Sequence, residues 1–441
     1  MPQSAAPYDL GAEQLDTVLV ATVDPHGRLK GKEIDAIHYR AHLASACTLQ
    51  APAYLLATDL GMTPVPGYSR RHRYGDLTLR LDHGTWRPLP WLPGTALLLA
   101  DPIDSAGTDL PIAPRAVLRH QLALLAELGY HARCALESEF MLYQGRASNL
   151  AKLPAAGWKP ATGTSSDFAL DHPPAVRAFT RALRTAMRTA GLPVEAVKAE
   201  TAPGQVELTF HHSEPMQACD QHLLMKHAAR TLGDTHHLAP VFMAAPQNGI
   251  GNGLHIHLSL WRGDTPITPG PGLAGLSQLG QHAVAGLLNN LPHLAVLYAP
   301  TTNSYKRYTG QVFAPARWTW GPDNRTCAVR IAGTGANTRL EIRVPGADAN
   351  PYLALAAALA AIRDGITQHS TPPPTETGNA YHTDAPHLPR TLDHALAGFN
   401  ANAPSLLGPE TVSHYAALAQ AEIDYQHGHV TDTETQRGLA C

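Results

Sequence analysis

Four short segments, far apart in the chain, alternate charged or imidazole side chains with apolar ones. They are residues 136–140 (LESEF), 206–210 (VELTF), 254–258 (LHIHL) and 339–343 (RLEIR). Because successive side chains on a strand point to opposite faces, each segment predicts a strand with one apolar and one charged face. A sheet face that carries carboxylates, imidazoles and guanidinium groups is typical of a pocket that holds cations and anions together. The pattern therefore favours phosphate chemistry with divalent metal ions.

The remaining periodicity predicts a β-rich N-terminal region, followed by helices that alternate with the charged strands. Strands are expected at 18–23, 54–57, 77–81 and 96–100, with turns at 24–27 and 82–84. Helices are expected at 115–128, 175–190, 220–232, 276–288, 351–362 and 412–425. Asn350 and Pro351 suit the N-cap and first position of one of these helices. The proline-punctuated stretch 109–114 predicts a boundary between two domains, 1–110 and 111–441.

Composition narrows the classes of partner and compartment. The chain has 441 residues and a formal net charge of -3, which does not favour nucleic acid or an anionic membrane as a partner. Its five cysteines lack metal-type spacing, which predicts reduced thiols and a cytoplasmic setting. Residues 1–9 lack the features of a signal peptide, and no apolar run reaches membrane-spanning length. The basic run 70–73 is interpreted as a solvated loop.

Two pairs of glutamates are candidates for metal binding. Glu137 and Glu139 lie on one face of an expected strand, about 7 Å apart, and they repel each other unless a cation sits beside them. Glu200 and Glu207 bracket the turn-like segment 201–204, which can return both acids to one cavity. Carboxylate-rich sites suit Mg²⁺, and one imidazole among the ligands moves the preference toward Mn²⁺. Surface glutamates on half-exposed strands are the alternative, which the fourfold recurrence of the pattern disfavours.

Histidines and arginines supply further ligands and positive charge to the predicted pocket. They lie on the charged strands or near a tryptophan-rich loop: His255, His257, Arg325, Arg330, Arg339 and Arg343. Arginines hold carboxylates or phosphates through two parallel hydrogen bonds. A pocket that combines metal ions with several arginines can neutralise a phosphoryl group during its transfer.

Six motifs, in this order, resemble the glutamine synthetase superfamily, and specifically its bacterial type I-like members. They are ESEF (137–140), APGQVE (202–207), GNGLHIH (251–257), NSYKR (303–307), FAPARWTWGPDNR (313–325) and RLEIRVPGADANPYLALA (339–356). The resemblance covers residues 15–430. It implies an α+β fold in which an N-terminal β-grasp domain precedes a catalytic α/β domain with a curved antiparallel sheet. It also implies a homo-oligomer of hexameric rings, usually a dodecamer, with active sites between neighbouring subunits.

The resemblance also implies a role for each motif residue. Two or three Mg²⁺ or Mn²⁺ ions are expected per site, the first on Glu139, Glu200 and Glu207 and the second on Glu137, His255 and Glu341. ATP is expected to contact Glu195, His257, Ser259 and Arg339. Glutamate is expected to contact Gly251, Arg307 and Arg343, and the transferred phosphoryl group is expected beside Arg325 and Arg330.

Members of this family form γ-glutamyl phosphate from glutamate and ATP, and an amine then displaces the phosphate. Two departures from the family pattern concern that amine. Phe313 stands where ammonia-using members have a flap glutamate, and a phenyl ring cannot accept a proton. The segment 58–62 (TDLGM) keeps one acid, Asp59, but loses the serines of a family segment that reaches the neighbouring subunit's site.

Both departures make the acceptor site more apolar. Trp318 and Trp320 are candidates to line it beside Phe313; the alternative is that a tryptophan near position 320 belongs only to the core of the family's fold. The two departures resemble the γ-glutamyl-amine ligases, which use polyamines, ethanolamine, alkylamines or aromatic amines. We therefore predict an ATP-dependent ligase that joins glutamate to an organic amine. The alternatives are an ammonia-using glutamine synthetase and a non-catalytic scaffold, and the intact set of six metal ligands disfavours the scaffold.

Overall fold

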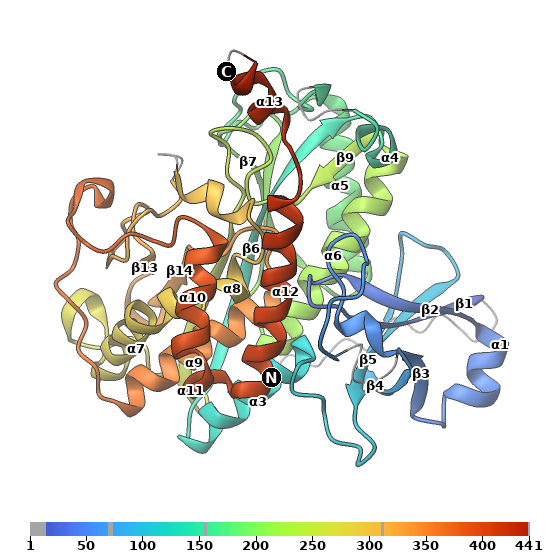
Figure 1. Cartoon of the computed structure of the whole chain (residues 1–441), viewed down its shortest axis with the longest axis horizontal. Coiled ribbons are helices and arrows are strands. Elements are labelled where there is room, and N and C mark those ends of the chain that lie inside the picture. The colour runs from blue at the N-terminus through green and yellow to red at the C-terminus, as the bar shows by residue number, and fades with distance from the viewer. Residues whose placement is uncertain (1–14, 69–73, 154–156, 310–312, 440–441) are drawn as a thin grey trace.

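The computed structural model describes residues 15–68, 74–153, 157–309 and 313–439, which form two β-sheets and their flanking helices (Figure 1). The basic run 70–73 lies outside the described residues. The first sheet has, within these ranges, five strands in the order β2-β1-β5-β4-β3, with β1 and β5 parallel and the other neighbours antiparallel. The strands are β1 (Thr17–Val23), β2 (Leu29–Asp35), β3 (Thr48–Pro52), β4 (Asp76–Pro88) and β5 (Thr95–Ile103). The expected β-rich N-terminal region is thus confirmed, whereas its β-grasp classification stays a prediction.

Two local expectations in this region are wrong. The expected strand at 54–57 is instead a 3₁₀-helix, Ala53–Leu56, followed by its C-cap residue Ala57, and Ala53 and Leu56 are buried in the N-terminal core. A short apolar run fits such a buried turn as well as a strand. The expected turn at 82–84 lies within β4, whose pairing with β5 shifts register between Asp82 and Arg87. There the Leu99 N–H donates to Thr85 Oγ1, so a side chain replaces a ladder bond and the strand continues.

The second sheet carries all four charged segments on neighbouring strands. Its path through the described residues is β12-β13-β14-β10-β6-β8-β7, with β9 beside β6 and β11 beside β10. The strands are β6 (His131–Gln144), β7 (Val194–Ala199), β8 (Gln205–Phe210), β9 (Leu238–Val241), β10 (Leu254–Arg262), β11 (Thr265–Pro266), β12 (Trp320–Pro322), β13 (Val329–Ala332) and β14 (Arg339–Ile342). All pairings are antiparallel except β12 with β13. The sheet is therefore predominantly antiparallel, as expected.

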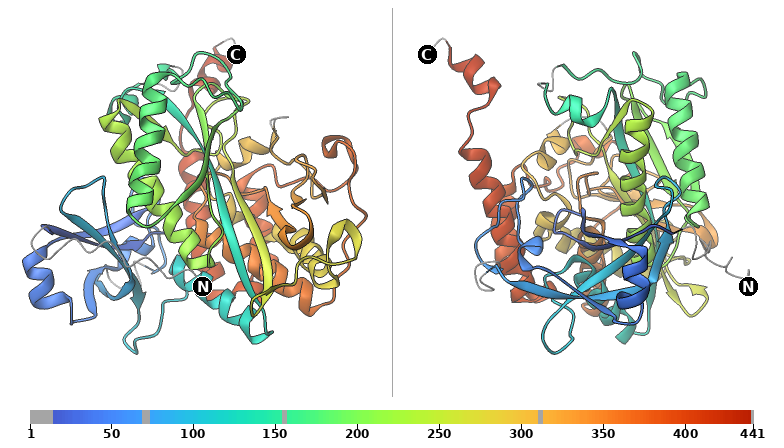
Figure 2. Two further views of the ribbon diagram at one scale, coloured as in Figure 1. Left: turned by 180° about the vertical axis from the view of Figure 1, so that it is seen from behind. Right: turned by 90° about the vertical axis from the view of Figure 1, so that its right-hand side faces the viewer.

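Helices cover the apolar face of this sheet, so the charged face is left for a site. The described residues form the following helices, of which α1 lies in the N-terminal region and α13 buries no residue: α1 (Ala36–His38), α3 (Pro114–Glu127), α4 (Ala147–Leu150), α5 (Pro174–Thr189), α6 (Pro215–Thr235), α7 (Gln278–Asn290), α8 (Ala295–Tyr298), α9 (Pro351–Thr367), α10 (Leu392–Asn402), α11 (Pro404–Leu407), α12 (Pro409–His427) and α13 (Asp432–Gly438). Apolar residues of β6, β10 and β14 share one core with α3, α7 and α9, and those of β8 share another with α5 and α6. Seen from behind, β6 and β10 run side by side with these helices flanking them (Figure 2).

The buried helix α9 shows how the sequence sets this packing. The Asn350 side chain accepts a hydrogen bond from the Tyr352 N–H, and Pro351 occupies the first turn, as expected. Gly286 of α7 packs so closely that a Cβ there would lie 2.1 Å from the Ala361 carbonyl oxygen. The two helices can approach only because glycine has no side chain.

The N-terminal region is joined to the rest of the chain by specific polar contacts. The Asn350 amide donates to the carbonyl oxygens of Asp24 and Pro25, which lie in the turn between β1 and β2. Trp91 Nε1–H donates to His227 Nδ1 of α6 at 2.8 Å. The described part of the chain contains no helix that is long and apolar enough to cross a membrane.

Candidate active site

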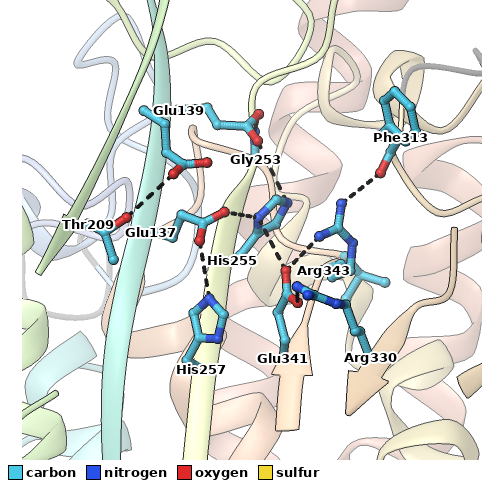
Figure 3. Close-up of polar contacts among 12 residues, drawn as sticks. Glu137, Glu139, Thr209, Gly253, His255, His257, Phe313, Arg330, Glu341 and Arg343 are labelled. Carbon is cyan, nitrogen blue, oxygen red and sulfur yellow. Dashed lines mark hydrogen bonds and ion pairs between the residues drawn. The ribbon is translucent and has the colours of Figure 1, made fainter. Parts of the chain in front are cut away.

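The charged face of the four neighbouring strands forms the wall of a cavity of about 1130 Å³ (Figure 3). Cross-strand pairing places Glu139 opposite Glu207, Glu137 opposite His255, and His257 opposite Glu341. Fourteen of the residues proposed from sequence line this cavity: Glu137, Glu139, Glu195, Glu200, Glu207, His255, His257, Ser259, Phe313, Arg325, Arg330, Arg339, Glu341 and Arg343. The strand register therefore brings together side chains that are up to about two hundred positions apart in sequence.

The first expected metal group is assembled by a hairpin. One carboxylate oxygen from each of Glu139, Glu200 and Glu207 lies within 4.8 Å of the others. The turn between β7 and β8 returns Glu200 to Glu207, and the Glu200 N–H donates to the Gln205 carbonyl oxygen at 3.0 Å. Gly204 in this turn has a φ of +77°, and a Cβ there would lie 2.6 Å from a backbone oxygen. Glycine is thus required for the turn that converges the carboxylates.

The electrostatics of this group fit a bound cation. Burial and the charge of Glu137 raise the pKa of Glu207 to about 10, although the Lys198 ammonium, 3.1 Å from the carboxylate, opposes the rise. Lys198 also pairs with Glu200. Burial and the neighbouring acids thus disfavour the ionised form of Glu207, and a bound cation would stabilise that form. Three converging carboxylates are the donor set that Mg²⁺ or Mn²⁺ prefers.

The second expected group is centred on Glu137, which contacts two histidines. Glu137 accepts from His255 Nδ1 at 2.7 Å and from His257 Nε2 at 3.2 Å. Burial alone would raise the pKa of Glu137, but these hydrogen bonds hold it well below its ordinary value. Ligand atoms of Glu137, His257 and Glu341 lie within 4.8 Å of one another, as do those of Glu137, Glu139 and His255. His257, expected at the nucleotide, is thus also within reach of a metal ion.

Two arginines hold Glu341 from either side. Its two carboxylate oxygens accept from Arg330 and from Arg343, each at 2.6 Å. Burial opposes ionisation, but the Arg343 charge, the largest favourable influence, lowers the pKa of Glu341 to about 2. Arg343 also donates to the backbone oxygen of Phe313 at 3.0 Å, which links the flap residue to the floor of the site (Figure 3).

Besides two tryptophans of the expected acceptor wall, three of the residues proposed from sequence do not line this cavity: Gly251, Arg307 and Asp59. Arg307 is buried beside it, where it donates to the carbonyl oxygens of residues 343 and 344 and lies 3.5 Å from His255 Nε2. Gly251 lies against Arg307, because a Cβ there would approach Arg307 Cγ to 2.9 Å. Asp59 is in a turn that borders a different hollow, with α12. The single chain therefore does not bring Asp59 to its own cavity.

The acceptor wall differs from the one expected. Trp318 and Trp320 are buried in the core and do not line the cavity, so the expectation that they line it is wrong and the alternative, a core tryptophan near position 320, is confirmed. The Trp320 indole N–H donates to the Pro373 carbonyl oxygen, which fixes the ring inside the fold. The lining residues that sequence reasoning missed include Asp167, Phe168, Lys198 and Trp261. The alternation in Lys198-Ala199-Glu200 was a signal for the lysine, whereas Asp167 and Phe168 lie in a loop without periodicity.

Comparison with known proteins gives consistent matches along the whole chain. The family described as glutamine synthetase, catalytic domain, matches residues 111–438. A γ-glutamylethanolamide synthetase, GlnA4 of Streptomyces coelicolor, is 38% identical over 435 residues, covering 98% of this chain and 94% of that protein. A glutamate–isopropylamine ligase of a Pseudomonas species is 31% identical, covering 96% and 95% of the two chains. A solved structure described as a GmaS/ADP complex superposes with a TM-score of 0.83 at 27% identity, covering 97% of each chain.

Proposed function

Because this chain belongs to the glutamine synthetase family, we propose that it is an ATP-dependent ligase that joins the γ-carboxylate of glutamate to an organic amine. The observation that carries this proposal is Phe313, whose side chain is 58% exposed in the wall of a cavity otherwise rich in acids and arginines. An apolar ring at this position favours an amine that carries a hydrocarbon group over ammonium. Relatives named for ethanolamine, isopropylamine and methylamine support the same substrate class.

Each group of cavity residues has a proposed role in the first half of the reaction. Glu139, Glu200 and Glu207 would hold one divalent cation, and Glu137, His255 and Glu341 would hold another. Metal ions bound there would neutralise the phosphate oxygens of ATP. Arg325 and Arg330 would contact the phosphoryl group during its transfer to the γ-carboxylate of glutamate. ADP and phosphate are then the products beside the γ-glutamyl amide.

The nucleotide and the glutamate are proposed to bind on opposite sides of this phosphoryl position. Glu195, His257, Ser259 and Arg339 would contact ATP. The Arg339 Nε–H already donates to His257 Nδ1 at 3.2 Å, which directs the opposite ring nitrogen of His257 toward Glu137. Arg343, with Arg307 and Gly251 beneath the cavity, would hold the carboxylates of glutamate.

We also propose that the active site is completed by a neighbouring subunit in a ring-shaped homo-oligomer. The support is the position of Asp59, which lies outside the cavity of its own chain. A neighbouring chain is then the source of this carboxylate. The N-terminal region is proposed to be the β-grasp domain that would present it.

The proposal is tested with a panel of acceptors supplied with ATP, glutamate and Mg²⁺ or Mn²⁺. The panel contains ammonium, methylamine, ethanolamine, isopropylamine, putrescine, spermine and aniline. ADP formation and the γ-glutamyl product are measured for each, and we expect kcat/KM for at least one organic amine to exceed that for ammonium. Turnover with ammonium alone would identify an ordinary glutamine synthetase. No turnover with any acceptor, in protein shown to bind metal, would favour the scaffold.

A further inference from the structure

Lys198 is the one lysine that lines the cavity in the described part of the chain, and the reaction proposed above gives it no role. It lies on β7, directly opposite Glu207 in the pairing of β7 with β8. Its ammonium contacts the carboxylates of Glu200 and Glu207, the latter at 3.1 Å. These two acids, with Glu139, form the first metal group. A positive charge that belongs to the chain therefore neutralises the acids that are proposed to hold a divalent cation.

The fold holds the Lys198 side chain in this position. Because side chains alternate along a strand, Lys198 and Glu200 both face the cavity. The Lys198 side chain is only 25% exposed. Its Nζ lies 4.7 Å from the centroid of the Phe168 ring, and the Phe168 N–H donates to the Ala199 carbonyl oxygen at 3.2 Å. Two carboxylates and an aromatic ring thus surround the ammonium, and both kinds of group stabilise a cation.

The cations at Glu341 differ from Lys198, because each has a second partner. Arg330 also donates to Asp323, and Arg343 also donates to a backbone oxygen of the flap. In the part of the chain that the structure describes, Lys198 forms ion pairs only with the two acids of the first metal group. Lysine carries a compact charge on a flexible stem of four carbons. Its ammonium can therefore leave these acids without breaking another ion pair.

We propose that Lys198 is an internal cation that competes with the first divalent metal ion and so sets the metal requirement of the site. This inference rests on the proposed function, because the metal group belongs to that reaction. Without a metal ion, the ammonium neutralises carboxylates that would otherwise repel one another. A divalent cation that binds there displaces the ammonium, because the two would share the same carboxylates at short range. Lys198 is thus a positioning residue that keeps the site assembled and lowers its affinity for metal.

Mn²⁺ binding to the purified protein, followed by electron paramagnetic resonance without substrates, tests this competition. Lys198→Met removes the charge and keeps a flexible side chain of similar length. We expect the dissociation constant of one class of Mn²⁺ sites to fall about tenfold or more. If the ammonium instead supports the metal ligands, the same variant should bind Mn²⁺ more weakly. Unchanged or weaker binding by Lys198→Met therefore overturns the proposal.

Matched variants identify the charge and the site. Lys198→Arg keeps the charge and should bind Mn²⁺ as the wild type does. Lys152→Met removes an exposed lysine outside the cavity lining and should also bind normally. Glu200→Gln removes a ligand of the first metal group, so adding Lys198→Met to it should change Mn²⁺ affinity less than about twofold. An equal gain in both backgrounds would place the effect at another site and would contradict the proposal.

Thermal unfolding separates competition from a merely structural role. In the presence of a chelator, Lys198→Met should have a lower Tm than the wild type, because the carboxylates lose their counter-charge. Saturating Mn²⁺ should narrow this difference, because the ion stabilises the variant more than the wild type. A deficit of equal size with and without Mn²⁺ would show that only packing was lost. If Lys198→Met does not fold, Lys198→Gln, which keeps a hydrogen-bond donor for the acids, serves for the same comparisons.

The failure of this inference is distinguishable from failure of the proposed function. If the wild type binds no Mn²⁺ and forms no product with any acceptor, the proposed function is wrong and the role of Lys198 with it. If the wild type is active and the loss of the Lys198 charge does not tighten Mn²⁺ binding, the proposed function stands and only the role of Lys198 is wrong.

Discussion

At the scale of single residues, Phe313 connects the part of the cavity wall where we propose that the acceptor binds to the charged residues of the cavity. Its backbone has a φ of +57°, which costs a non-glycine residue about 1–2 kcal/mol. Its carbonyl oxygen accepts from Arg343, which also holds Glu341. The exposed ring is therefore presented by a backbone that the site itself anchors. A change of side chain at this position should alter the acceptor without disturbing the ligands.

The first residue-scale prediction is that Phe313→Glu shifts the preference toward ammonium. The introduced carboxylate can pair with the ammonium ion. The substitution also removes the apolar ring that favours the hydrocarbon group of an organic amine. We expect the ratio of kcat/KM for ammonium to that for the best organic amine to rise about tenfold or more, measured by ADP formation. Leu170→Glu introduces the same charge at an exposed position outside the cavity lining and should leave the ratio unchanged. An unchanged profile in Phe313→Glu would mean that this residue does not set specificity.

At the scale of elements, the alternation of apolar and charged residues predicted the four charged strands. It could do so because helices cover only one face of their sheet. Glu137 and Ser138 illustrate the limit of this rule: alternation gives the face of each side chain, but not which strand lies beside it. The order β14-β10-β6-β8 and its register arise from long-range packing that no local pattern contains. The acceptor wall was predicted poorly for a related reason. Asp167 lies in an aperiodic loop, and the rings of Trp318 and Trp320 were apolar enough to enter the core instead.

The element-scale prediction concerns Gly253, which lies in the glycine-containing turn just before β10. At Gly253 a Cβ would lie 2.6 Å from His255 Nε2 and 2.8 Å from an Arg307 guanidinium nitrogen, so Gly253→Ala must displace one of them. We expect Mn²⁺ affinity to fall about tenfold or more, the usual result when the support of a metal ligand is disturbed, with a parallel loss of ADP formation. Mn²⁺ binding is measured by electron paramagnetic resonance titration of the purified protein. Gly163→Ala, where a Cβ meets nothing within 4 Å, serves as the control and should bind Mn²⁺ normally. Normal binding by Gly253→Ala would contradict the assignment of His255 as a ligand.

At the scale of the whole molecule, the last long helix, α12, packs both against the segment just before α3 and against Tyr68 of the N-terminal region. Thr411 and Tyr415 of α12 donate their hydroxyl hydrogens to the carbonyl oxygens of Pro111 and Ile112, just before α3. His414, which lies between these two residues in sequence, is buried, and its ring centroid is 6.2 Å from that of Tyr68. Sequence periodicity located α12 but not this contact, because its hydrogen bonds join residues 300 and 303 positions apart. The stability of the molecule should therefore depend on a histidine that no sequence motif marks.

The last prediction is that His414 makes this packing sensitive to acid. Burial lowers the pKa of His414 to about 4 from its ordinary value of 6.5, although a hydrogen bond to the Leu56 carbonyl opposes the shift. Between these two values the unfolded chain binds a proton that the folded chain does not, so the free energy of unfolding falls as the pH is lowered. The loss is complete near pH 4 and amounts to about 3 kcal/mol.

Thermal unfolding between pH 7.5 and 4.5 measures this effect against two variants. His414→Gln keeps a donor for the Leu56 carbonyl but has no proton to gain, so its Tm should be lower than that of the wild type at pH 7.5 and should fall less on acidification. His427→Gln removes an exposed histidine from the same helix and should follow the wild-type curve. Other buried histidines, such as His26 and His222, also have lowered pKa values and contribute equally to all three proteins. Parallel Tm curves for the wild type and His414→Gln would therefore show that the contact between α12 and the N-terminal region does not carry the acid sensitivity.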